Sequence, residues 1–398
     1  MSDLHLGYRE YGKFERVEDF HKAAMTAANL IVEERPDFVV IPGDIFHHAR
    51  PYPIDQRQAI SVFDVFRKQG IPVFASRGNH DASHAWTLRQ GANELDVLQD
   101  LGLVRYLEDD SAEVKLDGDK TVRVWGLGYH GSDVGARLAS MVKGKEKILS
   151  NRRIPNVLLA HEYLDSMVPS AEISESVLDA YGFDYVALGH FHQWWLNRSQ
   201  TICCTGSTEH VSALEWDEPE RSVAIVSLPI SRGRTKPSVR RLNFKVRPKI
   251  RRQLVLGTCT IDEATEAAKS ALSEMDLHGA IVRIDIKAKF SDTQGTLDVG
   301  SIVEVAKNAL HVMIVPEIEY AGLEIREDLS DNDLMRQVFI QKLGVPEKEA
   351  ARWVSLAEDM KELLGESLDS KAESSILGLL YSFSEPRSPG TRRRREGR

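Results

Sequence analysis

Seven side chains in the first half of the chain are of the kinds that bind metal ions. Their carboxylate, amide and imidazole groups suit manganese, iron or zinc better than a soft metal, and no thiolate is among them. They are Asp3, His5, Asp44, Asn79, His161, His190 and His192. One tetrahedral ion cannot use seven ligands, whereas two ions that share a carboxylate can. The pattern therefore predicts two divalent metal ions, with Mn²⁺ as the first choice and Asp44 as the bridging ligand.

Two ions held roughly 3.5 to 4 Å apart stabilise both the attacking and the leaving oxygen of a phosphoryl displacement and lower the pKa of a bound water. We therefore expect hydrolysis of a phosphate ester without a covalent intermediate. His80 directly follows Asn79, and a histidine with a pKa of about 6.5 can protonate a departing alkoxide, so His80 is assigned as general acid or transition-state stabiliser. His47 is a second candidate that faces the phosphate. Asp81 is expected to orient His80 or a metal ligand, because such imidazoles usually donate their other N–H to an acceptor.

Short apolar runs precede these polar segments and resemble buried β-strands. They lie at 38–41, 71–75, 157–159 and 185–188. In layered α/β folds, ligands bind outside the carboxyl ends of the strands, so the polar segments that follow the runs should meet at one edge. The sequence therefore predicts an α/β fold that carries the metal site on a sheet edge.

Each motif taken alone carries limited weight. An Asp-x-His pair or a Gly-Asp turn arises often by chance, whereas the segments 78–81 and 189–192 are more specific. In the second of these, two imidazoles one residue apart point to the same side of an extended backbone. Five other histidines are interpreted as ordinary surface or packing residues, and His48 and His210 stay unassigned. Those five are His21, His84, His130, His278 and His311.

Three further segments, 2–8, 43–47 and 205–209, extend the pattern. In them the chain resembles the calcineurin-like metallophosphoesterases. Within that superfamily it is similar to the DNA double-strand-break repair nucleases of the meiotic-recombination-eleven and SbcD type, and the archaeal form has the most similar layout. The resemblance is strong over residues 1 to about 230. It implies a four-layer α/β/β/α sandwich, the seven residues above as ligands of two metals, and His80 and His47 as catalytic histidines that are not ligands.

The resemblance also implies an activity and partners. The activity is a manganese-dependent 3′ to 5′ exonuclease on duplex DNA and an endonuclease on single strands or hairpins, acting on DNA ends in double-strand-break repair. The partners are DNA ends, an SMC-like ABC ATPase of the SbcC type and a second copy in a homodimer. The dimer contacts are expected through helices of the nuclease domain that carry Ile60, Val62, Phe63 and Val65, or through residues near Trp86. Two alternatives stay open: another dimetal phosphodiesterase or phosphatase, and a catalytically weak scaffold that tethers DNA.

The N-terminal segment differs from the family pattern. Family members carry an apolar strand before the segment that begins at Ser2, whereas here Met1 directly precedes it. We expect a missing central strand to expose neighbouring backbone and core, and to leave Asp3 and His5 on a frayed terminus. This expectation is what makes the scaffold plausible, and a chain extended upstream would distinguish it from an enzyme. A second difference is His210, which stands where the family pattern has arginine.

Changes in composition and periodicity suggest further domains. Strand-like and helix-like stretches alternate after the first domain. Beyond Glu324 the sequence becomes acidic, and its apolar residues recur at helical spacing. The resemblance implies that the second domain presses DNA against the metals and that the helices bind the ATPase. The alternative for the second domain is a purely structural role, and the alternative for the helices is packing on this chain's own domains. The predicted parts are a phosphoesterase domain at 1–240, a small α+β capping domain at 250–322, an ATPase-binding helical segment at 323–384 and a disordered basic tail at 385–398.

The net charge of −9 does not by itself favour DNA binding. Distribution matters more than the sum, and residues 232–252 hold many lysines and arginines but no acidic residue. The alternative is an edge strand protected by positive charge. No apolar stretch is long enough to span a bilayer, no signal peptide is recognisable, and the three cysteines lack metal-ligand spacing, so a cytoplasmic, nucleoid-associated protein is expected. The DNA-binding candidates are Arg240, Arg241, Lys245, Arg247, Lys249, Arg251 and Arg252.

Overall fold

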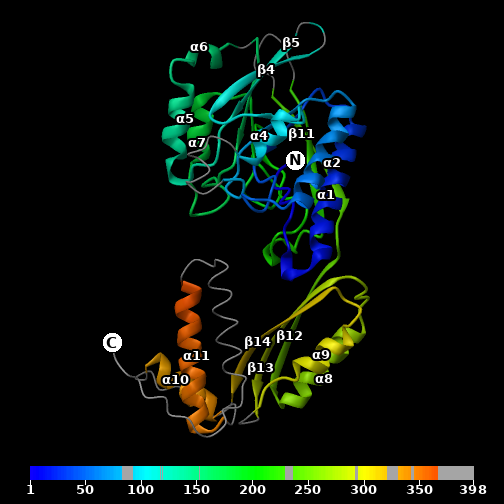
Figure 1. Ribbon diagram of the computed structural model, residues 1–398, viewed down its shortest axis with the longest axis vertical. Coiled ribbons are helices and arrows are strands. Elements are labelled where there is room, and N and C mark those ends of the chain that lie inside the picture. The colour runs from blue at the N-terminus through cyan, green and yellow to red at the C-terminus, as the bar shows by residue number, and fades with distance from the viewer. Residues whose placement is uncertain are drawn as a thin grey trace, which may run out of the picture. The chain divides into compact units, whose positions relative to one another are not determined.

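The computed structural model divides the chain into two compact units, Met1–Lys249 and Ile250–Arg398 (Figure 1). It describes residues 1–365 except for 83–92, 117, 119, 152, 229–235, 292–294, 321–329 and 342–344. The predicted tail at 385–398, the part of the predicted helical segment beyond residue 365, His84 and the dimer contacts expected near Trp86 lie outside the described residues.

The first unit contains two sheets and a hairpin. One sheet is parallel and has the order β1-β2-β3. The other has the order β4-β5-β6-β7-β9-β8, and its strands β5, β6, β7 and β9 run parallel. The strand bounds are β1 Val39–Pro42, β2 Val73–Ser76, β3 Arg105–Tyr106, β4 Asp110–Leu116, β5 Lys120–Gly126, β6 Asn156–Ala160, β7 Tyr185–Leu188, β8 Trp195–Leu196 and β9 Ile202–Cys204. The hairpin pairs β10 (Glu220–Ser227) with β11 (Ser238–Lys245).

Helices cover the outer faces of the two sheets, which gives four layers. The bounds are η1 Glu10–Gly12, α1 Phe14–Glu33, α2 Pro53–Lys68, α4 Glu94–Asp100, η2 Gly131–Asp133, α5 Val134–Val142, α6 Glu146–Leu149, α7 Glu175–Tyr181 and η3 Ala213–Glu215. Helices α1 and α2 pack on β1, and α5 and α7 pack on β6 and β7. A third core, which includes Phe74, Val124 and Val157, fills the space between the sheets. The predicted α/β/β/α sandwich is therefore confirmed.

The sequence of α1 and α2 explains this packing. Ala24, Ala28 and Ile31 recur at helical spacing and form the buried stripe of α1. In α2, Val62 and Phe63 are fully buried in the same core, whereas Ile60 and Val65 on the same helix are partly buried; dimer contacts through this helix stay a prediction.

The N-terminal segment is fixed rather than frayed. The backbone N–H groups of Asp3 and His5 donate to the carbonyl oxygens of Gly43 and Asp44 over 3.3 and 3.0 Å. Both side chains are fully buried, so the expectation of a frayed terminus is wrong. Met1 lines a pocket of about 570 Å³ together with core residues such as Val157.

A network of buried charges holds several distant segments of the first unit together. Arg16 on α1 is fully buried and contacts the carboxylates of Glu10, Asp19 and Glu209 at 2.8, 2.7 and 3.3 Å. Lys249, whose side chain is 1% exposed, also donates to Glu10 at 3.1 Å. The charges therefore connect α1, the loop at 205–210 and the end of the unit.

We predict that Arg16→Met lowers the free energy of unfolding by about 3 to 5 kcal/mol, because it leaves buried carboxylates without their main counter-charge. Urea unfolding monitored by circular dichroism measures this loss. Arg67→Met is the matched control, since Arg67 makes an exposed pair with Asp64 and should cost less than about 1 kcal/mol. Equal effects of the two substitutions would contradict the prediction.

The same network gives the variant a pH signature. Burial raises the pKa of Glu209, but hydrogen bonding from His210 and the charge of Arg16 outweigh it and lower the pKa to about 2. A carboxylate with a lowered pKa stabilises the fold fully above its unfolded pKa of about 4.3 and loses that effect as the pH falls through the folded value. Stability between pH 5 and pH 2 should therefore fall more steeply in the wild type than in Arg16→Met.

The second unit is a three-stranded sheet with two helices. The strand order is β12-β13-β14, and β13 and β14 run parallel. The apolar faces of the helices and strands form one core that includes Ala268, Ile284 and Ile302. These elements lie where the sequence predicts an α+β unit. Their bounds are β12 Lys249–Cys259, α8 Ile261–Ser273, β13 Ile281–Phe290, α9 Val299–Val305 and β14 His311–Tyr320.

Two more helices follow, α10 (Asp331–Gln341) and α11 (Glu347–Gly365). The rings of Phe339 and Trp353 stack with their centroids 6.1 Å apart, which joins the two helices. Ala350 and Val354 form a buried stripe on α11. None of the described helices is long and apolar enough to cross a membrane.

Candidate metal centre

The predicted ligands lie on loops that leave the carboxyl ends of four strands and on the N-terminal segment. Asp44 follows β1, Asn79 follows β2, His161 follows β6, and His190 follows β7. Asp3, His5, Asp44 and His190 have φ angles of 52°, 44°, 48° and 79°. Such angles are costly for residues other than glycine and persist where the surrounding structure enforces them, often at functional sites. The tight turns therefore aim four ligands at one place.

Asp3, His5, Asp44 and His192 form one ligand group, in which the candidate ligand atoms all lie within 4.8 Å of one another. The Nε2 atoms of His5 and His192 are 3.1 Å apart. His5 Nε2 lies 3.6 Å from Asp44 Oδ2, and His192 Nε2 lies 3.8 Å from Asp3 Oδ1. Two imidazole nitrogens that face each other beside two carboxylates are arranged to share one cation.

A second group adjoins the first through Asp44. His161 Nε2 lies 3.2 Å from Asp44 Oδ2 and 3.0 Å from Asn79 Oδ1. The rings of His161 and His190 have centroids 4.9 Å apart. His161 Nδ1 donates to the carbonyl oxygen of Pro42 over 2.9 Å, which leaves Nε2 to act as the ligand. Asp44 Oδ2 therefore stands between two imidazoles, His5 and His161, as the predicted bridge requires.

The buried polar atoms of the site fit two bound cations. Asp3 Oδ2 and Asp44 Oδ2 are buried and have no hydrogen-bond partner among the described residues, a costly arrangement that a metal ion would relieve. Burial lowers the pKa of His5 and lowers that of His190 to about 3, which keeps these imidazoles neutral and able to bind metal. Burial lowers the pKa of His161 as well, but the Asp44 charge raises it to about 10.

Glycines leave room for the ligands. A Cβ atom on Gly43 would lie 2.2 Å from His161 Nδ1, and one on Gly78 would lie 2.1 Å from Asp44 Oδ1. Both distances are shorter than any real contact, so the two loops can approach the ligands only without side chains.

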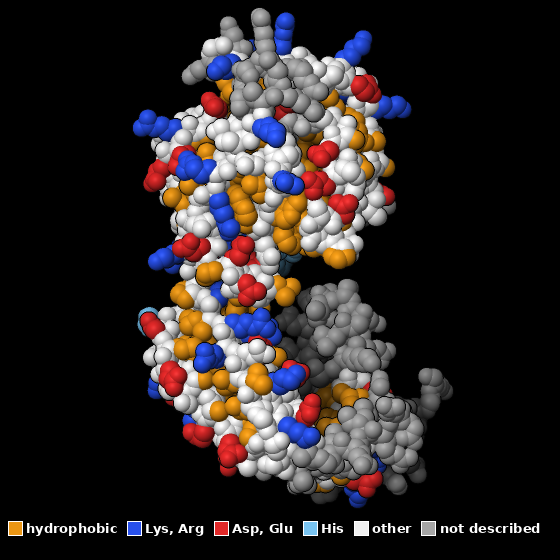
Figure 2. All heavy atoms as spheres, turned by 180° about the vertical axis from the view of Figure 1, so that it is seen from behind, with side chains coloured by type: hydrophobic (Ala, Val, Ile, Leu, Met, Phe, Trp, Pro, Cys, Tyr) orange, Lys and Arg blue, Asp and Glu red, His pale blue; other side chains and the backbone are white. Residues whose placement is uncertain are grey.

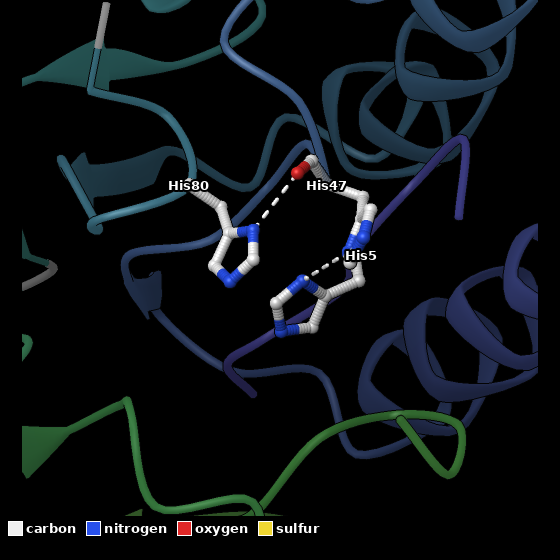
Figure 3. Close-up of side chains that lie close together, drawn as sticks. All are labelled: His5, His47 and His80. Carbon is white, nitrogen blue, oxygen red and sulfur yellow. Dashed lines mark hydrogen bonds between the residues drawn. The ribbon is translucent and has the colours of Figure 1, made fainter. Parts of the chain in front are cut away.

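His80 lies beside the two groups (Figure 3). Its Nδ1 donates to the carbonyl oxygen of His47 over 2.8 Å, which leaves Nε2 available, and its backbone N–H donates to Asp44 Oδ1 over 2.9 Å. The His47 and His80 rings stack with centroids 4.8 Å apart, and His47 Nδ1 lies 3.2 Å from His5 Nδ1. His5, His47 and His80 also satisfy the geometry of a three-histidine metal group. The hydrogen bond from His80 Nδ1 favours the reading of His80 as a proton donor next to the ligands.

Asp81 binds backbone groups instead of an imidazole. Its carboxylate accepts the N–H groups of Phe46 over 2.9 Å and of Gly78 over 3.0 Å. The structure thus differs from the expected contact with His80 or a ligand. Asp81 fastens the loop that carries Asp44 to the loop that carries Asn79, because a buried carboxylate must find such donors.

The profile of the family described as calcineurin-like phosphoesterase matches residues 1–194 of this chain. The N-terminal part of the chain is a calcineurin-like phosphoesterase domain. The resemblance predicted from the sequence is therefore confirmed, and the matched residues include all seven predicted ligands.

Curated relatives of this phosphoesterase carry the name DNA double-strand break repair protein Mre11. The Archaeoglobus fulgidus protein is 41% identical over 107 residues, which cover 27% of this chain and 23% of the relative. The Methanocaldococcus jannaschii protein is 27% identical over 55% of this chain and 58% of the relative. The Thermoplasma acidophilum protein is 29% identical over 63% of this chain and 66% of the relative. The chain thus spans between about a quarter and two thirds of these relatives.

Most of the predicted DNA-binding cations of the phosphoesterase and its neighbouring unit make ion pairs. Arg240 pairs with Glu34, Arg241 with Glu218, Arg247 with Asp19, Lys249 with Glu10 and Arg251 with Asp285. Lys245 and Arg252 are exposed. On the face shown in Figure 2, Lys and Arg side chains of the described residues are interspersed with Asp and Glu. Lys245 and Arg252 are therefore better placed than the buried Lys249 to reach a phosphate.

The sequence reading missed two buried residues beside the ligands, Glu215 and Arg221. Glu215 Oε1 lies 3.2 Å from His192 Nδ1, and Arg221 contacts the backbone oxygen of His192. The only signal in the sequence was the capping-box pattern from Ser212 to Glu215. His210, left unassigned, is a packing residue whose Nε2 donates to the carbonyl oxygen of Glu218 over 2.8 Å.

Proposed function

We propose that this chain is a metal-dependent nuclease that processes DNA ends in double-strand-break repair. The observation that carries the proposal is Asp44, whose buried Oδ2 stands between the imidazoles of His5 and His161. Two divalent ions, with Mn²⁺ as the first choice, would be held by Asp3, His5, Asp44, Asn79, His161, His190 and His192. When bound, such ions polarise the phosphate and lower the pKa of a water.

The remaining chemistry belongs to the protein. His80 Nδ1 is occupied by the His47 carbonyl, so Nε2 is the atom that would deliver a proton to the leaving oxygen. His47 is half-buried behind it, and burial lowers its pKa to about 3. A neutral His47 would orient His80 through stacking and the backbone contact rather than add charge.

The specific nuclease activities proposed for this chain rest on its resemblance to the double-strand-break repair nucleases. We propose 3′ to 5′ exonuclease action on duplex DNA and endonuclease action on single strands or hairpins, in a homodimer and in a cytoplasmic, nucleoid-associated setting. Residues 250–322 would press DNA against the metals. The name of the curated relatives supports a role in double-strand-break repair.

An ATPase partner is the last part of the proposal. Helices α10 and α11 already form a pair, yet Trp353 stays 39% exposed on α11. An apolar side chain on such a pair suits docking on another helical surface. We propose the coiled-coil base of an SMC-like ABC ATPase of the SbcC type as that surface.

A panel of substrates tests the function. The purified chain is given Mn²⁺, Mg²⁺ or chelator with labelled linear duplex, single-stranded and hairpin DNA, and with nitrophenyl esters of a phosphodiester and a phosphomonoester. Shortening of duplex DNA with Mn²⁺ supports the nuclease. Turnover of the small esters without any DNA cleavage would favour the other dimetal phosphodiesterase or phosphatase. The burial of Asp3 and His5 argues against a weak tether, and DNA binding without turnover of any substrate would favour that alternative.

A further inference from the structure

Glu215 contacts a metal ligand from the side opposite to the metal site. Its Oε1 lies 3.2 Å from His192 Nδ1, while His192 Nε2 faces His5 Nε2 at 3.1 Å. A carboxylate accepts a hydrogen bond, so Nδ1 carries the proton and Nε2 presents its lone pair to the Asp3, His5 and Asp44 group. The contact therefore selects the tautomer that can bind metal.

The carboxylate of Glu215 is itself held on every side. Oε1 accepts the backbone N–H of Ser212 over 2.9 Å, and Oε2 accepts Ser207 Oγ over 3.0 Å and the backbone N–H of Val211 over 3.1 Å. The residue is 2% exposed. Together with His192 Nδ1 and Ser212 Oγ, five donors contact the carboxylate, so it cannot turn toward the metals and become a ligand without breaking these bonds.

Arg221 completes the arrangement. Its guanidinium is buried, donates from Nε to the Ser207 carbonyl oxygen over 2.9 Å and from Nη2 to Ser207 Oγ over 2.9 Å, and lies 3.7 Å from Glu215 Oε2. It also contacts the His192 carbonyl oxygen. Arg221 thus fixes the backbone of His192. It also balances the charge of the Glu215 carboxylate, which holds the imidazole ring of His192.

We infer that Glu215 is a positioning residue for the proposed metal centre: together with Arg221 it fixes the tautomer and direction of His192 and so sets the affinity for the ion shared by Asp3, His5, Asp44 and His192. The other ligand group is supported differently, since His161 Nδ1 donates to a neutral backbone carbonyl. Loss of the Glu215 charge should therefore weaken one of two ions selectively. The inference rests on the proposed two-metal function.

The test is titration of the metal-free full chain with Mn²⁺. Calorimetry measures the binding, and electron paramagnetic resonance detects the bound ions. The change is Glu215→Gln, which keeps the size of the side chain but not its charge. The matched control is Ser212→Ala, which removes a neighbouring contact to Glu215 over 3.2 Å without touching His192. Urea unfolding of each metal-free protein shows whether the fold is intact.

We expect Glu215→Gln to bind one Mn²⁺ about 10- to 100-fold more weakly, as is usual when the partner of a ligating histidine is removed, and to bind the other as the wild type does. Ser212→Ala should bind both ions normally, and Glu215→Asp should recover part of the affinity. Two ions bound by Glu215→Gln as tightly as by the wild type would overturn the inference, and so would equal losses in Glu215→Gln and Ser212→Ala. A wild-type chain that binds no Mn²⁺ would instead refute the proposed metal centre itself.

Discussion

Asp44→Asn is expected to reduce cleavage of duplex DNA by at least about 100-fold, the size of effect found when one preorganised electrostatic contact to a reacting group is lost. Asp44 contributes the carboxylate that both ligand groups contact, with Oδ2 at 3.6 Å from His5 Nε2 and 3.2 Å from His161 Nε2. Asparagine keeps the shape and can still accept the His80 N–H, but it removes the bridging charge. Cleavage of end-labelled duplex with Mn²⁺ measures the loss.

The metal-free stability of this variant separates a lost function from a lost fold. Asp44 Oδ2 lies 3.2 Å from His161 Nε2, and the Asp44 charge raises the pKa of that buried imidazole to about 10, so Asp44→Asn should lower the stability of the metal-free protein, and its circular dichroism shows whether the variant is still folded. Saturating Mn²⁺ should raise the unfolding temperature of the wild type, since a ligand at 100 times its Kd adds about 2.7 kcal/mol, and should leave Asp44→Asn unchanged. Asp64→Asn, at an exposed pair on α2, is the control. Wild-type cleavage by Asp44→Asn would refute the bridging role.

His80→Ala is expected to lower kcat by about 10² to 10⁴, the usual contribution of a general acid. His80 Nε2 is the ring nitrogen left available by the bond to the His47 carbonyl, and His80 is not needed for either of the two proposed ligand groups. Binding of two Mn²⁺ ions should therefore persist. Single-turnover cleavage measures the loss, and metal titration shows what is retained.

A variant that loses cleavage but still binds both metal ions has lost a proton donor and not a metal ligand. His21→Ala is the control, because His21 contacts Ser61 over 2.9 Å on the helical side of the domain. This substitution should change neither cleavage nor metal binding. If His80→Ala loses one metal ion, the three-histidine group of His5, His47 and His80 is a metal site and the assignment as general acid is wrong.

The convergence of the proposed ligands Asp44, Asn79, His161, His190 and His192 could be predicted because each follows a strand and sits in a recognisable motif. Asp44, His161 and His190 illustrate this, since the ends of neighbouring strands must meet at one edge. Glu215 and Arg16 could not be predicted in the same way. Glu215 contacts His192, 23 positions away, and Arg16 contacts Glu209, which lies far along the chain, so neither contact follows a sequence period.

Two expectations depend on contacts that only the fold reveals. The N-terminal segment is ordered because the backbone of residues 43–45 accepts its N–H groups. The basic stretch is largely neutralised because carboxylates from other elements reach it, as in the pair of Lys249 with Glu10. Neither contact leaves a trace in local sequence, because Asp3 and Gly43 are 40 positions apart (43 minus 3) and Glu10 and Lys249 are 239 positions apart.

The most direct test is cleavage of end-labelled linear duplex DNA by the chelator-treated chain as Mn²⁺ is added back in measured equivalents. The two-metal nuclease predicts no cleavage without metal and a steep rise as the second equivalent binds. It also predicts that Asp44→Asn stays inactive at every concentration. Cleavage that persists in chelator, or no cleavage at any Mn²⁺ concentration by a folded chain that binds DNA, would contradict it.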